Sequence, residues 1–202
     1  MALNLAINVG VKKSIINKMK CVCLWNPGKR TNYSYSTIPS LRGFVFLNQE
    51  KPEEDVKVVI YINGLEDGLH GIHIHEKSMT DVKDLNATNC CDKLGGHFNV
   101  GSSWSLTDPH GTPHGSHTGD LCLNIRSKDR KAYFCYYDSK ISLFEGDKRN
   151  VTNRTVVIHE NEDDLGKGIY LEEDKNIASL VNGNAGKRVS CAEIRKIMDP
   201  DF

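Results

Sequence analysis

The stretch 56–76, VKVVIYINGLEDGLHGIHIHE, contains the two patterns from which the fold class of this chain is predicted. Positions 56, 58, 60 and 62 are all Val or Ile, and this period of two predicts a strand over 56–63 with one buried face. The Asn63-Gly64 pair that follows indicates a turn. A second strand is then expected over residues 70–76, and the two together favour an antiparallel sheet.

The second of these strands carries three histidines within six residues, His70, His73 and His75. Residues two apart in a strand point to the same face, so His73 and His75 are expected to lie side by side. Imidazole is a ligand for copper, zinc, iron and nickel, and a polar pair of this kind does not suit an apolar core. By itself the pattern leaves a chance match open, because a lone His-x-His is common.

Similar short patterns recur along the chain and predict an all-β protein with about eight strands. No long segment shows helical periodicity, and Gly, Asn, Asp and Pro separate the strands, which is typical of an antiparallel sandwich or barrel. The short link 128–130 suggests a hairpin. Two long connections, 77–120 and 161–187, are of the length that is usually functional or disordered. The remaining expected strands are 19–25, 42–48, 121–125, 131–138, 155–160 and 188–194.

Composition favours one domain without a nucleic-acid or membrane partner. Lys plus Arg and Asp plus Glu both total 26 in 202 residues. Charge therefore gives no sign of nucleic-acid binding, and no apolar run approaches the roughly 18 residues of a membrane helix. We expect a flexible extension over residues 1–18 and a domain over 19–202. The extension lacks a basic region before its apolar residues and is not interpreted as a signal peptide, so a cytoplasmic location is expected.

Histidine clustering gives a second indication of a metal site. All eight histidines lie between residues 70 and 159. The loop 77–120 holds His97, His110, His117 and Asp120, and four nitrogen and oxygen ligands of this kind can complete a closed zinc site. A polar, merely solvated loop is the alternative.

Five segments in fixed order resemble the signature segments of eukaryotic-type Cu/Zn superoxide dismutases. The resemblance covers residues from about 20 to 198 and implies an eight-stranded antiparallel Greek-key β-sandwich or barrel, immunoglobulin-like, with two long functional loops. The five segments are GLHGIHIHE (68–76), GGHFN (95–99), HTGDL (117–121), RTVVIHENEDDLGKG (154–168) and GNAGKRVSC (183–191).

The resemblance implies two metal ions that share one histidine. His97 would bridge them, and losing both ring protons is plausible only between two cations. Asp163 would accept hydrogen bonds from His73 and His110, one ligand of each metal. The implied copper ligands are His73, His75, His97 and His159, and the implied zinc ligands are His97, His110, His117 and Asp120.

Further roles also follow only from the resemblance. Catalytic roles fall to His97, which would return a proton to the product, and to Arg188, which would attract the anionic substrate. Cys91 and Cys191 would form an intrasubunit disulfide, with Cys90 as a competitor. His70 would be structural, whereas His114 has no family role and is expected at the surface. The other cysteines, Cys21, Cys23, Cys122 and Cys135, are expected to be buried on strands.

The implied reaction is dismutation of superoxide to dioxygen and hydrogen peroxide by alternate reduction and oxidation of copper, beside a structural zinc. A non-enzymatic copper- or zinc-buffering protein and a silent interaction module of the same fold are the alternatives. The family also favours a homodimer. Its usual apolar contact positions carry Thr152, Asn153, Glu193, Arg195 and Lys196 here, so a standard interface would be unusually polar.

Overall fold

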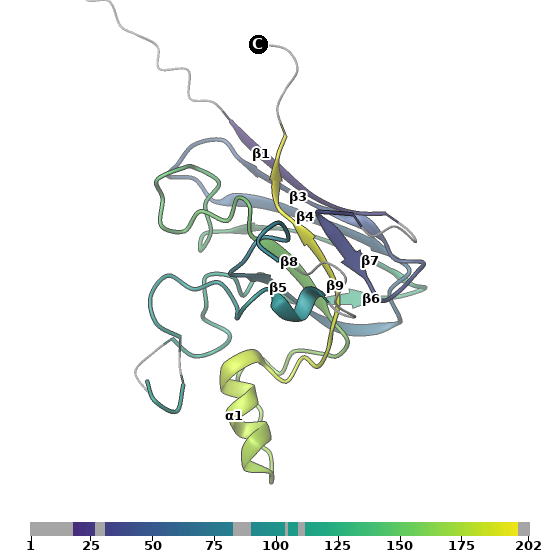
Figure 1. Ribbon diagram of the computed structural model, residues 1–202, viewed down its shortest axis with the longest axis vertical. Helices are drawn as coiled ribbons and strands as arrows, with labels where there is room; N and C mark the ends of the chain where they lie inside the picture. Colours follow the sequence, from purple (N-terminus) through teal and green to yellow (C-terminus); the bar gives the residue numbers. More distant parts are fainter. Residues whose placement is uncertain (1–17, 27–30, 83–89, 104, 109–111, 198–202) are drawn as a thin grey trace, which may run out of the picture.

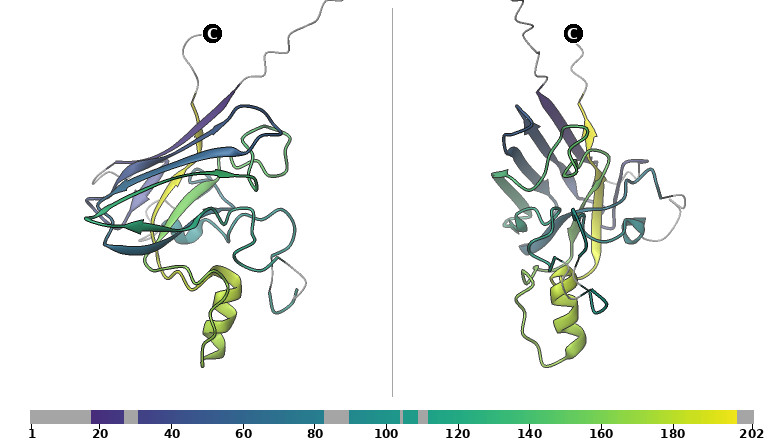
Figure 2. Two further views of the ribbon diagram at one scale, coloured as in Figure 1. Left: turned by 180° about the vertical axis from the view of Figure 1, so that it is seen from behind. Right: turned by 90° about the vertical axis from the view of Figure 1, so that its left-hand side faces the viewer.

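The computed structural model describes residues 18–26, 31–82, 90–103, 105–108 and 112–197 of the chain. These residues form two five-stranded antiparallel sheets that lie as two layers, with one α-helix beyond one end (Figures 1 and 2). The two sheets are not closed into a barrel, so the sandwich form of the predicted fold is the one observed. The first sheet has the order β10-β1-β3-β4-β7 and the second the order β2-β9-β8-β5-β6.

The first sheet contains three strands whose predicted bounds match the structure. These are β1 (Met19–Trp25), β4 (Val56–Asn63) and β7 (Lys131–Asp138). In β4 the side chains at 56, 58, 60 and 62 are fully buried between the sheets and the alternate ones are half-buried, as the period of two predicts. The sheet is completed by β3 (Arg42–Gln49) and the two-residue β10 (Arg195–Lys196).

The second sheet carries the histidine-rich strand in a position covered on both faces. Every residue of β5 (Gly68–His75) from His70 onward is buried, and all five residues of β8 (Thr155–His159) are buried. These two strands pair with each other, and β8 also pairs with β9 (Arg188–Glu193). The edges of this sheet are β2 (Ser34–Ser36) and β6 (Leu123–Ser127).

The predicted hairpin across residues 128–130 is wrong, because the two strands that it joins belong to different sheets. β6 pairs with β5 and β7 pairs with β4, and only an isolated bridge between Lys128 and Lys131 connects them. Asp129 and Arg130 both have positive φ, 51° and 58°, so the link turns sharply. The backbone amides of both residues donate to the Asp67 carboxylate, which holds this corner between the layers.

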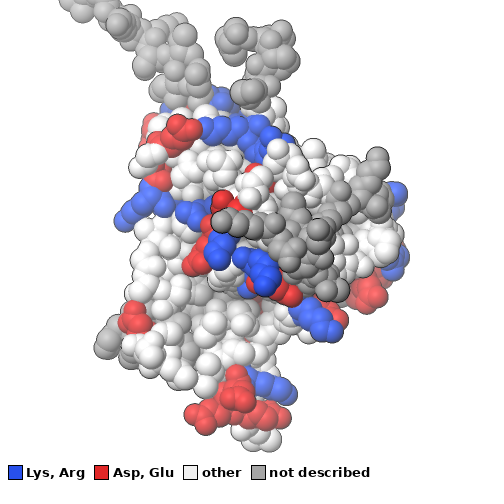
Figure 3. Space-filling view, viewed as in Figure 1, with Lys and Arg blue, Asp and Glu red and all other residues white. Residues whose placement is uncertain are grey.

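The structure also contains one helix that was not predicted, α1 (Glu173–Asn182). It lies within the second long connection and projects from one end of the sandwich (Figure 1). Acidic side chains gather at that end (Figure 3), where Glu172, Glu173 and Asp174 are exposed at the start of the helix. Carboxylates at this position stabilise a helix through its dipole. Gly183 ends the helix in a left-handed conformation with φ 68°.

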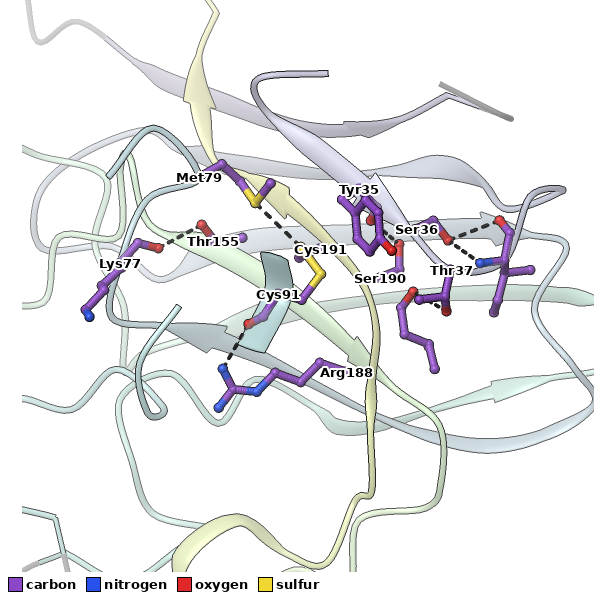
Figure 4. The surroundings of a disulfide bond; sticks show 12 residues. Tyr35, Ser36, Thr37, Lys77, Met79, Cys91, Thr155, Arg188, Ser190 and Cys191 are labelled. Carbon is purple, nitrogen blue, oxygen red and sulfur yellow. Dashed lines mark hydrogen bonds between the residues drawn. A yellow bond between two sulfur atoms is a disulfide. The ribbon is translucent and has the colours of Figure 1, made fainter. Parts of the chain in front are cut away.

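The first long connection is tied to the second sheet by the predicted disulfide, which is present. Cys91 lies in the short 3-10 helix η1 (Cys90–Lys93) and is bonded to Cys191 of β9 (Figure 4). Both sulfur atoms lie in a small buried cluster that also includes Met79 and Leu94. Among the residues that the structure describes, the one α-helix falls short of the length that a bilayer crossing requires.

Candidate metal centre

The first histidine group assembles from β5, β8 and the loop that follows β5. His73 and His75 point to one side of β5, and an isolated bridge brings His97 beside His75. His159, at the end of β8, completes the group. Each residue is buried and offers a ring nitrogen, and these atoms all lie within 4.8 Å of one another. The structure therefore brings together the four residues that were expected to bind copper.

Hydrogen bonding leaves one buried nitrogen without a partner on three of these four rings. His73 donates through Nε2 to Asp163 at 2.6 Å, whereas His75 and His159 donate through Nδ1 to the carbonyls of Gly95 and Gly186. The opposite nitrogens, His73 Nδ1, His75 Nε2 and His159 Nε2, are buried and have no hydrogen-bond partner. Three buried acceptors that converge without donors fit a cation, since a buried polar atom without a partner is costly.

The second group forms around Asp120 and shares His97 with the first. Asp120 accepts from His97 Nδ1 at 2.9 Å, so Nε2 is the His97 nitrogen that remains for the first group. The other Asp120 oxygen accepts from the backbone amides of Gly115 and His117. The group consists of His97, His114, His117 and Asp120, all buried and again within 4.8 Å.

The fourth member of this group is His114, and the expectation of a surface histidine there is wrong. His114 is 4% exposed, and its Nε2 lies 2.8 and 2.9 Å from the two oxygens of Asp163. Its Nδ1 and that of His117 have no hydrogen-bond partner, so both are left for a cation. His110, which was expected in this role, lies outside the described residues.

Asp163 lies between the two groups and hydrogen-bonds to one histidine of each. It is 1% exposed, and it accepts from His73 of the first group and from His114 of the second. The partner expected on the second side was His110. Because each ring is bound through Nε2, its Nδ1 carries the lone pair that faces the site.

Burial keeps the first group uncharged. It lowers the pKa of His73 and His75 well below 6.5, and the neighbouring His97 adds to the effect. Burial likewise lowers the pKa of His159 to about 4. For His114, burial opposes the charged form, but the nearby carboxylates of Asp120 and Asp163 outweigh it and raise the pKa to about 9. The second group thus favours positive charge more than the first does.

Arg188 borders the first group and is anchored by the disulfide loop. Its guanidinium donates to the carbonyl of Cys91 at 3.0 Å (Figure 4). It also donates to the carbonyl of Gly95 at 2.8 Å. The Gly95 carbonyl also accepts from His75, so one oxygen joins the arginine to the histidine group. Burial lowers the pKa of Arg188, but an arginine remains charged at neutral pH.

His70 is structural, as the resemblance implied. It is absent from both histidine groups, and its ring nitrogens lie 3.1 and 3.0 Å from the carbonyl oxygens of His159 and Glu66. These contacts connect the start of β5 to the end of β8, where His159 of the first group lies. The contact is with backbone, which explains why a histidine in the same short motif as His73 and His75 takes no part in the centre.

Several supporting residues were missed by the sequence reasoning. The side chain of Asn124 clamps the backbone of Asp163 through two hydrogen bonds of 2.8 Å. Asp164 accepts hydrogen bonds from Tyr170, Ser179 and Asn184. These bonds hold the second long connection, which contains α1, next to the centre. No local pattern marks these residues, because their partners are distant or lie in the irregular loop.

Comparison with known proteins agrees with this architecture. The fold and the paired histidine groups define a β-sandwich protein with a two-metal centre. Residues 41–194 match the family model of copper/zinc superoxide dismutase. The chain is 39% identical over 161 residues to Cu-Zn superoxide dismutase 4 of Dictyostelium discoideum, covering 78% of this chain and 92% of the relative. It is 33% identical over 154 residues to Cu-Zn superoxide dismutase 5 of the same organism, covering 75% of this chain and 88% of the relative. The chain belongs to the copper/zinc superoxide dismutase family, a family of enzymes.

Gly183 provides a test of the contact between Asp163 and His114. A Cβ at Gly183 would lie 2.2 Å from Asp163 Oδ1 and 2.5 Å from His114 Nε2. We expect Gly183→Ala to displace this pair and to lower the zinc content of purified protein, measured by plasma emission spectrometry. Gly146→Ala is the matched control, because Gly146 also has positive φ but no atom near its Cβ. Backbone strain of about 1 kcal/mol is common to both variants. Equal zinc loss in the two would show that the Asp163 contact is not responsible.

Proposed function

We propose that the first histidine group binds the catalytic copper and that the second binds zinc, with His97 between them. The observation that carries this assignment is the set of five buried histidine nitrogens without hydrogen-bond partners, all of which face the two groups. The first group offers nitrogen alone, which suits copper, whereas the second adds a carboxylate and gives a closed set of four ligands, which suits structural zinc. In this proposal His114 takes the place that was expected for His110.

The activity proposed for this centre is dismutation of superoxide to dioxygen and hydrogen peroxide. Bound copper supplies a one-electron couple that accepts an electron from one superoxide and returns it to another. Arg188 lies beside the histidine group and attracts the anion through a fixed, charged donor. His97 Nε2 can hold a proton and pass it to the departing peroxide, while Nδ1 stays on the Asp120 side. Asp163 keeps His73 and His114 in the required tautomers.

Removal of one copper ligand tests the enzymatic assignment. We expect the purified protein to contain copper and zinc and to turn over superoxide. His159→Ala should lose copper and lower turnover by more than about 100-fold while zinc stays bound, since His159 belongs to one group alone. Metal analysis measures the copper and zinc content, and a superoxide assay measures turnover. Copper without turnover in the unmodified protein would favour the buffering alternative, and neither copper nor turnover would favour the silent module.

Two histidines four residues apart allow a direct test of the zinc ligand. We expect His114→Ala to lower the zinc affinity by more than about tenfold, because it removes both a ligand and the partner of Asp163. His110→Ala is the matched control and should bind zinc as the unmodified protein does. Competition with a chromogenic chelator measures the affinity. Loss of zinc in His110→Ala alone would return the ligand role to His110.

A two-fold homodimer is also part of the proposal. The segments that the family uses for its contact border one depression of about 680 Å³. Carboxylates and guanidinium groups both line it, including Asp81, Glu193, Arg154 and Arg195. A patch with both signs of charge can be complementary to a second copy of itself across a two-fold axis.

Sedimentation equilibrium tests the dimer. We expect twice the 22.6 kDa chain mass at micromolar concentration. Arg195→Glu should shift the protein toward monomer, because it reverses one of the charges around the depression. Lys128→Glu makes the same charge change at an exposed position outside the depression and should leave the mass unchanged. A monomer mass for the unmodified protein contradicts this part of the proposal.

We further propose a cytoplasmic location. Cys135 was expected to be buried, but it is an exposed thiol, because it lies on the outward side of the edge strand β7. An exposed unpaired thiol suits a reducing compartment better than an oxidising one. Cell fractionation against organelle markers tests the location.

A further inference from the structure

The outer face of the sheet β10-β1-β3-β4-β7 carries an apolar surface that the dismutase centre does not use. Side chains from four neighbouring strands lie in register across this face in two rows. The first row consists of Leu24, Phe44, Tyr61 and Tyr133, and the second of Val22, Phe46, Val59 and Cys135.

This surface departs from the usual pattern of an antiparallel sandwich, in which one face of each sheet packs on the core and the other is polar. The inner face is already complete, with Cys23, Val45 and Ile60 fully buried. On the outer face, within the part of the chain that the structure describes, Leu24 is 54% exposed and Tyr133 is 69% exposed. Apolar area of this kind on a soluble protein indicates a surface that something covers.

A groove of about 490 Å³ leads from this surface to the beginning of β1. Phe46 and Val59 of the second row line it, together with Tyr137. Lys18 and Lys20 line it at the point where the preceding chain joins β1. Residues 1–17 are therefore attached at the mouth of a groove that opens onto the apolar rows.

The attached segment has the composition that such a surface would bind. Positions 3, 5, 7, 9 and 11 are Leu, Leu, Ile, Val and Val, and the residues between them are Asn, Ala or Gly. An extended segment with this period presents its apolar side chains on one side. Seventeen residues reach about 55 Å when extended, whereas four strands span only about 14 Å, so the segment is long enough to cross the face.

Charge complements the apolar match. Lys12 and Lys13 directly follow the apolar run. Glu50, Glu54 and Asp55 line the groove close to the place where these lysines would lie. Opposite charges at this end would fix the direction in which the segment crosses the face.

We propose that residues 3–11 fold back over the outer face of this sheet and cover the two rows with their apolar side chains. The segment is expected to be flexible from sequence alone, and covering the face would give it a defined place instead. Attachment in the same chain gives it a high effective concentration at the groove, which a separate partner lacks.

The exposed thiol of Cys135, in the second row, reports on the covering. Its alkylation rate is measured by mass spectrometry of the peptide that contains it, in the full metal-loaded protein. Leu5→Asp combined with Ile7→Asp places charges on the apolar side of the segment. Asn4→Asp combined with Asn8→Asp adds the same charge to the opposite side and is the matched control. Superoxide turnover verifies that both variants are folded.

We expect alkylation to be about tenfold faster in the Leu5/Ile7 variant than in the unmodified protein, with the control variant unchanged. The rates should also be the same across about a hundredfold range of protein concentration, as an intrachain contact requires. Equal rates in all three proteins would overturn the proposal. Protection that increases with protein concentration would also overturn it and assign the face to a second copy of the chain.

Discussion

The metal centre depends on one buried carboxylate. Asp163 is almost completely shielded from water, and it is satisfied by His73 from the β5 strand and by His114 from the first long loop. A buried carboxylate without such partners is strongly disfavoured, so the two rings are held together even though they belong to different metal groups. Because both rings bind through Nε2, both Nδ1 atoms face inward. Asn124 fixes the backbone of Asp163 and so sets where the whole arrangement sits on the sheet.

The loops around this carboxylate are irregular, and they are held by a few strong contacts to the sandwich. The Cys91–Cys191 disulfide ties the first loop to β9, and Arg188 then binds two carbonyls of the tied loop. Asp164 gathers the second loop around α1. The arginine is thus positioned through the same disulfide loop that places the Gly95 carbonyl against His75. In the proposed function, a donor that is held in place in this way would need no rearrangement to bind an anion.

Much of the fold could be predicted from the local sequence pattern of the strands. The wrong predictions concern features that depend on contacts between distant parts of the chain. The strand 56–63 was predicted with correct bounds because its side chains alternate between core and exterior. The strand 131–138 was recognised by its aromatic and β-favouring residues, and the bounds of 19–25 were also correct. The prediction of a hairpin at 128–130 was wrong, because a short link does not reveal that the two strands it joins belong to different sheets. The buried role of His114 was missed because it depends on Asp163, 49 residues away.

One strand of the first sheet, β4, carries apolar residues on both of its sides. Residues 58–62 read Val-Val-Ile-Tyr-Ile, an unbroken apolar run of the kind that is typical of a strand covered on both faces. In the sandwich only one side of this strand meets the core, and Val59 and Tyr61 point away from it. Neighbouring strands place Phe46 and Phe44 opposite these two residues, so the outward apolar character is shared across strands and is not a single exception. A sheet built in this way has the sequence of a middle layer, which is the physical reason to expect a further segment on its outer side.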